Sequence, residues 1–209
     1  MAEVDFGPEA AIDTFSLQRD WFNRDLKQDP AALARPFPAC PVTDARPIKA
    51  AVWGPVNQSA LEDRDDVLVY STGPLAEPLT FAGTITAKLS VSTDTPDADW
   101  AVKIVDVRPD GVAINLATGI LRGRYRNSLL EPELMRAGKV YEITVDLGPC
   151  AATIAKGYQL RVDICGSLFP LYDRNPNTRE GIFGSQTAIA TEQVHHRLGA
   201  LSQIVLPLK

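Results

Sequence analysis

The feature that most constrains this chain is a strict two-residue alternation of apolar and polar side chains in residues 84–92. Ile85, Ala87, Leu89 and Val91 fall on one face, and threonine, lysine and serine fall on the other. This alternation is typical of a β-strand with one buried face. Residues 100–107 are instead apolar on both faces, which predicts an inner strand.

The alternation recurs along the chain, and the residues between the strands are rich in turn formers. Pro109-Asp110-Gly111 is a strong turn signal, so the strands on either side of it are expected to form a hairpin. Because the strands do not alternate with helices, the pattern argues against a parallel α/β sheet. We predict a mainly β fold, a jelly-roll β-sandwich of the galactose-binding-like kind. Further strands are predicted at 67–70, 112–116, 120–126, 141–147, 159–165 and 202–208.

The first 60 residues differ from the rest. Asp13 is a suitable N-cap, and Leu17, Trp21 and Leu26 recur close to the helical period, which predicts an amphipathic helix. Six prolines then interrupt any period between residues 28 and 60, as in a linker or an extended strap. The predicted organisation is a helix over 1–28, a proline-rich linker or strap over 29–60, and the sandwich over 61–209.

Charge and cysteine content restrict the partners. The net charge is −5, which argues against a nucleic-acid or anionic-membrane partner. The three cysteines are widely spaced and lack a CxxC motif, which favours reduced thiols in a cytoplasmic protein over a zinc site. The acidic N-terminus does not resemble a signal peptide, and no apolar run approaches the ~20 residues of a membrane span.

No complete catalytic constellation is present in the sequence. Gly166-Ser167 and Gly184-Ser185 both lack the second glycine of a nucleophile elbow. Only two histidines exist, His195 and His196, and adjacent residues of an extended chain point in opposite directions. No glycine-rich phosphate loop follows a strand, so no cofactor is predicted. We therefore predict no catalytic residue in this chain.

Two charged clusters stand out. Asp94, Asp97 and Asp99 are weak candidates for a calcium site; without the glycine and glutamate of an EF-hand, a solvated turn is favoured. An arginine stripe occupies alternate positions of residues 122–126. It suits either an acidic partner or acids on a neighbouring strand, and pairing with Glu142 and Asp146 is favoured. The stripe consists of Arg122, Arg124 and Arg126.

Residues 169–178, here called the proline loop, carry two aromatics and an Asp-Arg pair between two prolines. Proline forbids a regular helix or central strand, so the segment is a loop. It is either a structured corner held by internal hydrogen bonds or a docking surface, and the residues support both equally. The candidate contact residues are Phe169, Tyr172, Asp173, Arg174 and Asn175.

Several stretches together resemble one family. They are residues 62–70, Asp106-Val107-Arg108-Pro109-Asp110-Gly111, residues 119–126, residues 141–147, the Asp-Arg-Asn-Pro-Asn-Thr of the proline loop, and residues 204–207. In this order and spacing, they are similar to the C-terminal domain of the Xaa-Pro dipeptidyl-peptidase and cocaine-esterase group of serine hydrolases. Residues 4–27 resemble the last helix of that group's α/β-hydrolase domain.

The resemblance implies a non-catalytic domain that packs on a hydrolase core, braces it and helps to wall its active site. The serine, aspartate and histidine of the group's triad match no position here, so the chain alone is expected to be inactive. It is either a truncated gene product or a domain without its hydrolase core. Two alternatives remain open: a free-standing carbohydrate- or partner-binding jelly roll, and a chain that associates with a separate hydrolase-core polypeptide.

Overall fold

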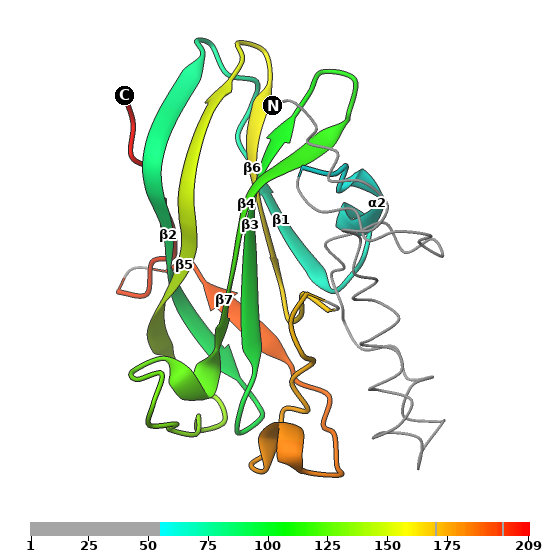
Figure 1. The fold of residues 1–209 in the computed structure, drawn as a ribbon, viewed down its shortest axis with the longest axis vertical. Helices are drawn as coiled ribbons and strands as arrows, with labels where there is room; N and C mark the ends of the chain where they lie inside the picture. The colour runs from blue at the N-terminus through cyan, green and yellow to red at the C-terminus, as the bar shows by residue number, and fades with distance from the viewer. Residues whose placement is uncertain (1–54, 170, 198) are drawn as a thin grey trace, which may run out of the picture.

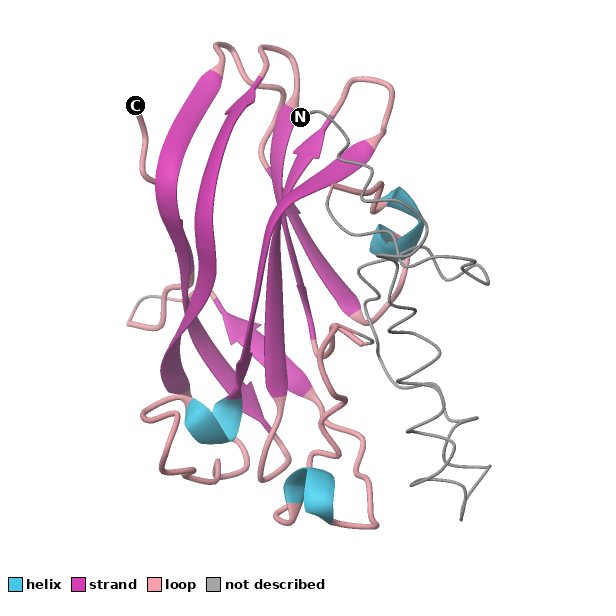
Figure 2. Ribbon diagram, in the orientation of Figure 1, coloured by secondary structure: helices cyan, strands magenta, loops and turns pink. Residues whose placement is uncertain are grey.

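The structure is a computed structural model that describes residues 55–169, 171–197 and 199–209 (Figure 1). Its strands form two antiparallel sheets, ordered β1-β6-β3-β4 and β5-β2-β7, with β8 also paired to β2 (Figure 2). The strands are β1 Val67–Ser71, β2 Leu79–Thr93, β3 Asp99–Val107, β4 Ala113–Arg122, β5 Tyr141–Ile154, β6 Gln159–Cys165, β7 Glu192–His195 and β8 Gln203–Val205. The helices are α2 Ser59–Glu62, and the 3-10 turns η1 Gly123–Tyr125 and η2 Gly181–Phe183.

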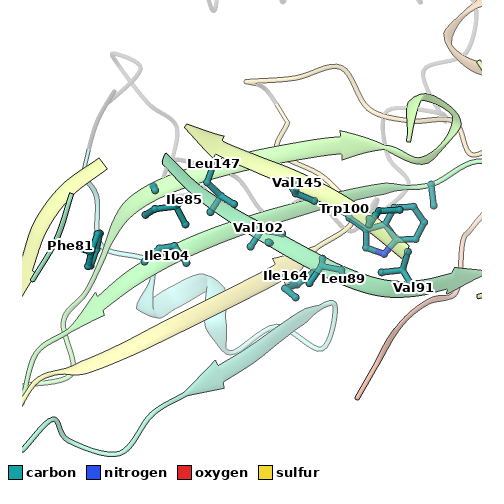
Figure 3. Close-up of a cluster of buried hydrophobic side chains, with 14 of the residues drawn as sticks. Phe81, Ile85, Leu89, Val91, Trp100, Val102, Ile104, Val145, Leu147 and Ile164 are labelled. Carbon is teal, nitrogen blue, oxygen red and sulfur yellow. The ribbon is translucent and has the colours of Figure 1, made fainter. Parts of the chain in front are cut away.

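The core lies between the two sheets. The apolar faces of β2 and β5 meet those of β3, β4 and β6 in one cluster of buried side chains. Figure 3 shows Ile85, Leu89 and Val91 of β2 beside Trp100 and Val102 of β3. The alternating face of residues 84–92 is thus the buried face of β2, and a mainly β sandwich is confirmed. Its jelly-roll topology stays a prediction.

Two strand predictions were wrong in detail. The predicted strands 112–116 and 120–126 are one strand, β4, which passes a β-bulge opposite Ile104 and Val105 and ends at Arg122. The short strand β7 was not predicted. It has only four residues, three of them polar, and it forms by pairing with the end of β2 at residues 90–93. Tertiary pairing rather than local propensity therefore determines β7.

The predicted N-terminal helix and residues 29–54 of the predicted strap lie outside the described residues. The remaining part of the strap, 55–60, packs on the sandwich. Gln58 is buried there, and its Oε1 accepts a hydrogen bond of 2.6 Å from Nζ of Lys103, a fully buried lysine of β3. This contact explains how an inner strand that reads as apolar accommodates a lysine.

The two sheets come into close backbone contact at Gly119 of β4. A Cβ atom at this position would lie 2.2 Å from the backbone oxygen of Asp146 in β5. Only a residue without a side chain allows the edges of the two sheets to meet here. The Ala-Thr-Gly segment that interrupts the strand pattern in the sequence is therefore a packing requirement.

We predict that Gly119→Ala lowers the free energy of unfolding by about 2 kcal/mol, because backbone atoms must move apart to admit the methyl group. Urea denaturation followed by circular dichroism measures the change. The matched control is Gly73→Ala, where the added Cβ has no atom within 4 Å. Equal stability of the two variants would contradict the close approach.

Candidate functional site

The proline loop is fastened to the sandwich by a buried asparagine. Asn175 is 4% exposed, and its Nδ2 donates hydrogen bonds to Oδ2 of Asp97 at 3.0 Å and to Oδ1 of Asp99 at 2.7 Å. Its Oδ1 accepts from the backbone N–H of Asn177 at 2.9 Å, which forms a local turn. One amide side chain thereby joins the loop to the segment that leads into β3.

Each of these two carboxylates also binds an arginine. Arg122 donates from Nε and Nη2 to the two oxygens of Asp99 at 2.9 and 3.0 Å. Arg124 donates from Nε to Oδ2 of Asp97 at 2.7 Å, and its backbone N–H donates to Oδ1 at 2.9 Å. We call these four residues together with Asn175 the corner cluster. Both carboxylates are almost completely buried and hydrogen bonded, as a buried charge requires.

The same arginines extend beyond the carboxylates to the proline loop. Nη2 of Arg122 donates to the backbone oxygen of Asp173 at 3.1 Å, and Nη2 of Arg124 donates to that of Thr178 at 2.6 Å. Nη1 of Arg124 donates to the backbone oxygen of Arg179 at 3.3 Å. The corner cluster therefore holds both ends of the segment 173–179, which makes the loop a structured corner.

The structure corrects two interpretations of charged residues. A solvated turn is wrong for Asp97 and Asp99, which are 0% and 2% exposed; only Asp94 is exposed, and it accepts a hydrogen bond from the backbone N–H of Thr191. In the part of the chain that the structure describes, no group of three or more histidine, cysteine, aspartate or glutamate side chains is arranged to hold a metal ion.

The arginine stripe does not pair with Glu142 or Asp146. Arg122 and Arg124 bind the aspartates of the corner cluster, and Nη2 of Arg126 lies 2.6 Å from Oε1 of Glu133. The reason is that β4 ends at Arg122, so the next two arginines belong to η1 and the residue after it. Without strand geometry, Arg124 is directed to Asp97, and the guanidinium of Arg126 lies 4.4 Å from the ring centroid of Tyr141 at the start of β5.

Burial dominates the electrostatics of the corner cluster. Burial raises the pKa of Asp99, although Arg122 and Asn175 both favour its charged form. Burial also opposes the charge of Arg122, but the hydrogen bond and charge of Asp99 outweigh this, and the pKa of Arg122 is raised. The guanidinium therefore remains charged, and the ion pair is maintained by geometry in spite of desolvation.

The outer side of the proline loop has a different character. Tyr172 is 48% exposed and Asp173 is exposed, while Phe169 and Arg174 are half-buried. η1 and η2, each next to a loop, lie at the same end of the sandwich (Figures 1 and 2). Loops 127–134 and 171–191, here called the end loops, carry exposed large apolar side chains at Leu129, Leu130, Tyr172, Ile182, Phe183 and Ile189.

Sequence reasoning identified Tyr172 but missed the other five apolar residues of the end loops. Leu130, Phe183 and Ile189 are each more than 90% exposed. The available signal was a large apolar side chain within a segment of turn-forming residues, as in Glu180-Gly181-Ile182-Phe183-Gly184. Such a residue is outside the strand period, so the sequence gives it no place on the buried face of a strand and its context favours exposure.

The candidate nucleophiles and bases are engaged elsewhere. Oγ of Ser167, which is buried, accepts from the backbone N–H of Phe169 at 3.2 Å. His195 and His196 point in opposite directions: Nε2 of His195 lies 2.9 Å from Oγ of Ser92, and Nε2 of His196 lies 3.0 Å from the hydroxyl of Tyr70. Within the described residues, no carboxylate is hydrogen bonded to the ring of His195, so the Ser92–His195 pair lacks the third member of a triad.

Comparison with known proteins finds a similar family over almost the whole chain. A family model described as the X-Pro dipeptidyl-peptidase C-terminal non-catalytic domain matches residues 5–204. The cocaine esterase of Rhodococcus sp. (strain MB1 Bresler) is 42% identical over 158 residues, which are 74% of this chain and 28% of the esterase.

Two solved structures share the fold of this chain. An α-amino acid ester hydrolase superposes with a TM-score of 0.71 at 34% identity, over 73% of this chain and 27% of the other. An aminopeptidase from a marine sediment archaeon, Thaumarchaeota archaeon, superposes with a TM-score of 0.74 at 33% identity, over 84% and 32%.

This chain belongs to the family of C-terminal non-catalytic domains of X-Pro dipeptidyl-peptidases, as the resemblance in its sequence indicated. It spans about a third or less of the length of these three relatives, which are named as an esterase, an ester hydrolase and an aminopeptidase. Among the described residues, no helix is long and apolar enough to cross a membrane.

We predict that Arg124→Met lowers the free energy of unfolding by about 3 to 5 kcal/mol, because it leaves the buried carboxylate of Asp97 without its cation. It should also speed amide hydrogen exchange in residues 173–179, which lose two backbone contacts. The matched control is Lys156→Met. Lys156 forms an exposed ion pair with Glu77, so its loss should cost less than about 1 kcal/mol. A small effect of Arg124→Met would mean that the corner cluster does not hold the loop.

Proposed function

We propose that this chain is the C-terminal β-sandwich of an Xaa-Pro dipeptidyl-peptidase-like serine hydrolase, in which it braces the hydrolase core and walls the active site. The observation that carries the proposal is the pairing of a rigid scaffold with exposed apolar side chains on the end loops. Leu130 and Phe183 are 91% and 93% exposed, yet the corner cluster fixes residues 173–179 within the second end loop. An isolated soluble domain gains nothing from such an arrangement.

The free energy of burying apolar side chains favours a protein surface as the partner of the end loops. Burying a leucine or phenylalanine side chain contributes about 1.5 to 3 kcal/mol, so a few such contacts are enough to attach a domain that is already covalently linked. Preorganisation lowers the entropy lost on docking, because the loops are ordered before contact. The relatives are three to four times as long as the matched region, so they contain a large partner surface in the same chain.

Of the residues considered for this contact from the sequence, Tyr172 and Asp173 face outward and Phe169 and Arg174 are half-buried. Asn175 is instead buried and hydrogen bonded within the corner cluster. We therefore propose Tyr172, together with the exposed apolar residues of the end loops, as the contact with the hydrolase core. The parent activity is proposed to be hydrolysis of prolyl dipeptides, esters or amides. Cys150 and Cys165 are not in disulfides, which suits a reducing, cytoplasmic location.

A chimera tests the bracing role. The matched region of the Rhodococcus cocaine esterase is replaced by the corresponding residues of this chain, and Tm and esterase activity are measured. Leu130→Ser and Phe183→Ser should each lower the Tm of the chimera by several degrees and leave the Tm of the separate chain unchanged, because the contact exists only in the chimera. The control is Leu208→Ser, which removes an apolar side chain that is 63% exposed outside the end loops. Equal effects of all three substitutions would contradict a specific contact.

The chain by itself should not hydrolyse esters or prolyl peptides. No serine among the described residues is placed in a triad, so a fluorophosphonate that labels serine hydrolases should leave the purified chain unlabelled while it labels the chimera. Turnover of p-nitrophenyl acetate above the solvent rate, or a labelled serine in the separate chain, would refute the proposal of a non-catalytic domain.

A further inference from the structure

A small pocket opens beside the corner cluster, between the C-terminal end of β6 and the start of β7. Its volume is about 150 Å³. Leu68, Ile164, Ala190 and Val194 provide apolar walls, and Asp65, Asp66 and Glu192 provide carboxylates. Leu68 and Asp65 are exposed, so the pocket is accessible from the surface. The proposed contact through the end loops does not use these residues.

The carboxylate of Glu192 is the most unusual group in the pocket. Among the described residues, it forms no hydrogen bond or ion pair. Its position depends on Gly166, because a Cβ atom there would lie 2.8 Å from Oε1 of Glu192. A side chain at residue 166 would displace the carboxylate, so the glycine provides the space that it occupies.

The surroundings of Glu192 are negative. Burial raises the pKa of Glu192 well above its ordinary value of 4.5, and the charges of Asp99, Asp94 and Asp97 raise it further. Asp65 and Asp66 add negative charge at the pocket, although Asp66 is paired with Arg64. The only other titratable side chain in the lining is the thiol of Cys165. A cation is therefore the complement that this pocket lacks.

A second polar group in the lining lacks a partner. Trp100 is fully buried, and its Nε1–H forms no hydrogen bond. A buried donor without an acceptor is costly, and such groups in native proteins are commonly satisfied by a bound molecule or by water. This observation is independent of the acidic residues and also indicates an occupant.

We propose that this pocket binds an alkylammonium group, whose charge pairs with Glu192 and whose methylenes lie against Leu68 and Val194. The volume suits a short alkyl chain, an ammonium head and one water molecule, which takes about 30 Å³. An ammonium ion is strongly hydrated, so the retained water can accept the hydrogen bond from Trp100 Nε1–H. A guanidinium is more weakly hydrated, so it is less suited to retain the water that accepts the hydrogen bond from Trp100 Nε1–H.

The binding experiment uses the full chain and n-butylammonium as the probe. The chain has three tryptophans, so a ¹H–¹⁵N spectrum shows three indole signals, and Trp100→Phe assigns the one from the pocket. Addition of n-butylammonium at pH 8 should shift the Trp100 signal along a saturating curve, while the other two signals stay in place. n-Butanol, which has the same size but no charge, should bind at least about tenfold more weakly.

Glu192→Gln should weaken the binding of n-butylammonium about tenfold or more, because the amide keeps the shape and removes the charge. The matched control is Glu142→Gln, an exposed glutamate of β5 outside the pocket, and it should bind like the unmodified chain. The spread of amide signals in the same spectra verifies that both variants are folded. The absence of a saturating Trp100 shift up to ~100 mM probe, or full binding by Glu192→Gln, would overturn the proposal.

The pH dependence is a test that needs no variant. Glu192 attracts the ammonium only when it is ionised, so affinity in the unmodified chain should be highest above the raised pKa of Glu192 and fall as the pH decreases through it. An ordinary glutamate would show this fall only near pH 4.5. An affinity that does not change between pH 8 and pH 4 would exclude Glu192 as the binding group.

The natural ammonium group is either a lysine side chain of a docked protein or a free alkylamine. A water-soluble carbodiimide, which joins a carboxylate to an amine, is added to the chain purified from its native host. An amide bond mapped from Glu192 to a lysine of a hydrolase identifies the first source, and a small amine attached to Glu192 identifies the second. Either product supports the pocket, and n-butylammonium binding does not depend on any hydrolase, so it tests the pocket separately from the proposed function. Lack of both products, together with no n-butylammonium binding, would refute it.

Discussion

The buried pairing of Asp97 and Asp99 with Arg124 and Arg122 is the interaction on which the functional end of this molecule depends. Asp99 begins β3 and Arg122 ends β4, so the pairing of these strands brings them together, and Asp97 and Arg124 lie two residues outside the strands. Such pairs add little net stability, because the cost of desolvating the charges offsets their attraction. Their effect is geometric: the directions of the guanidinium N–H groups fix where the backbone of the proline loop must lie.

The pairing of strands in the sandwich fixes the positions of the segments that carry these side chains. β2 pairs with β5 along one side and with β7 and β8 along the other, so it runs through the whole second sheet. Thr93 at its end leads into the segment that carries the two aspartates, while β7 brings Glu192 to the same region. The end loops, the corner cluster and the pocket therefore all depend on the position of β2.

Much of the fold could be predicted from the sequence, because a strand with one buried face leaves a two-residue period. This holds for residues 84–92 and 141–147, which became parts of β2 and β5. The period fails where pairing is imposed from outside, as in β7, and where packing demands small residues, as at Gly119. The composition of the proline loop indicated that the loop is important. It did not indicate which residues of the sandwich the loop contacts. Asn175 is 78 residues away from Asp97 in the chain, and no local pattern reports such a contact.

The division of the proline loop into two sides explains how one segment can be both a corner and a surface. Asn175 and the backbone oxygens of Asp173 and Thr178 are committed to the sandwich, so the backbone cannot adapt to a partner. Tyr172 and the large apolar side chains of the end loops are exposed at the same end of the sandwich. A partner therefore meets a surface whose shape is set before binding. In the proposed role beside a hydrolase core, this fixed shape is the property through which the domain would influence the geometry of the active site.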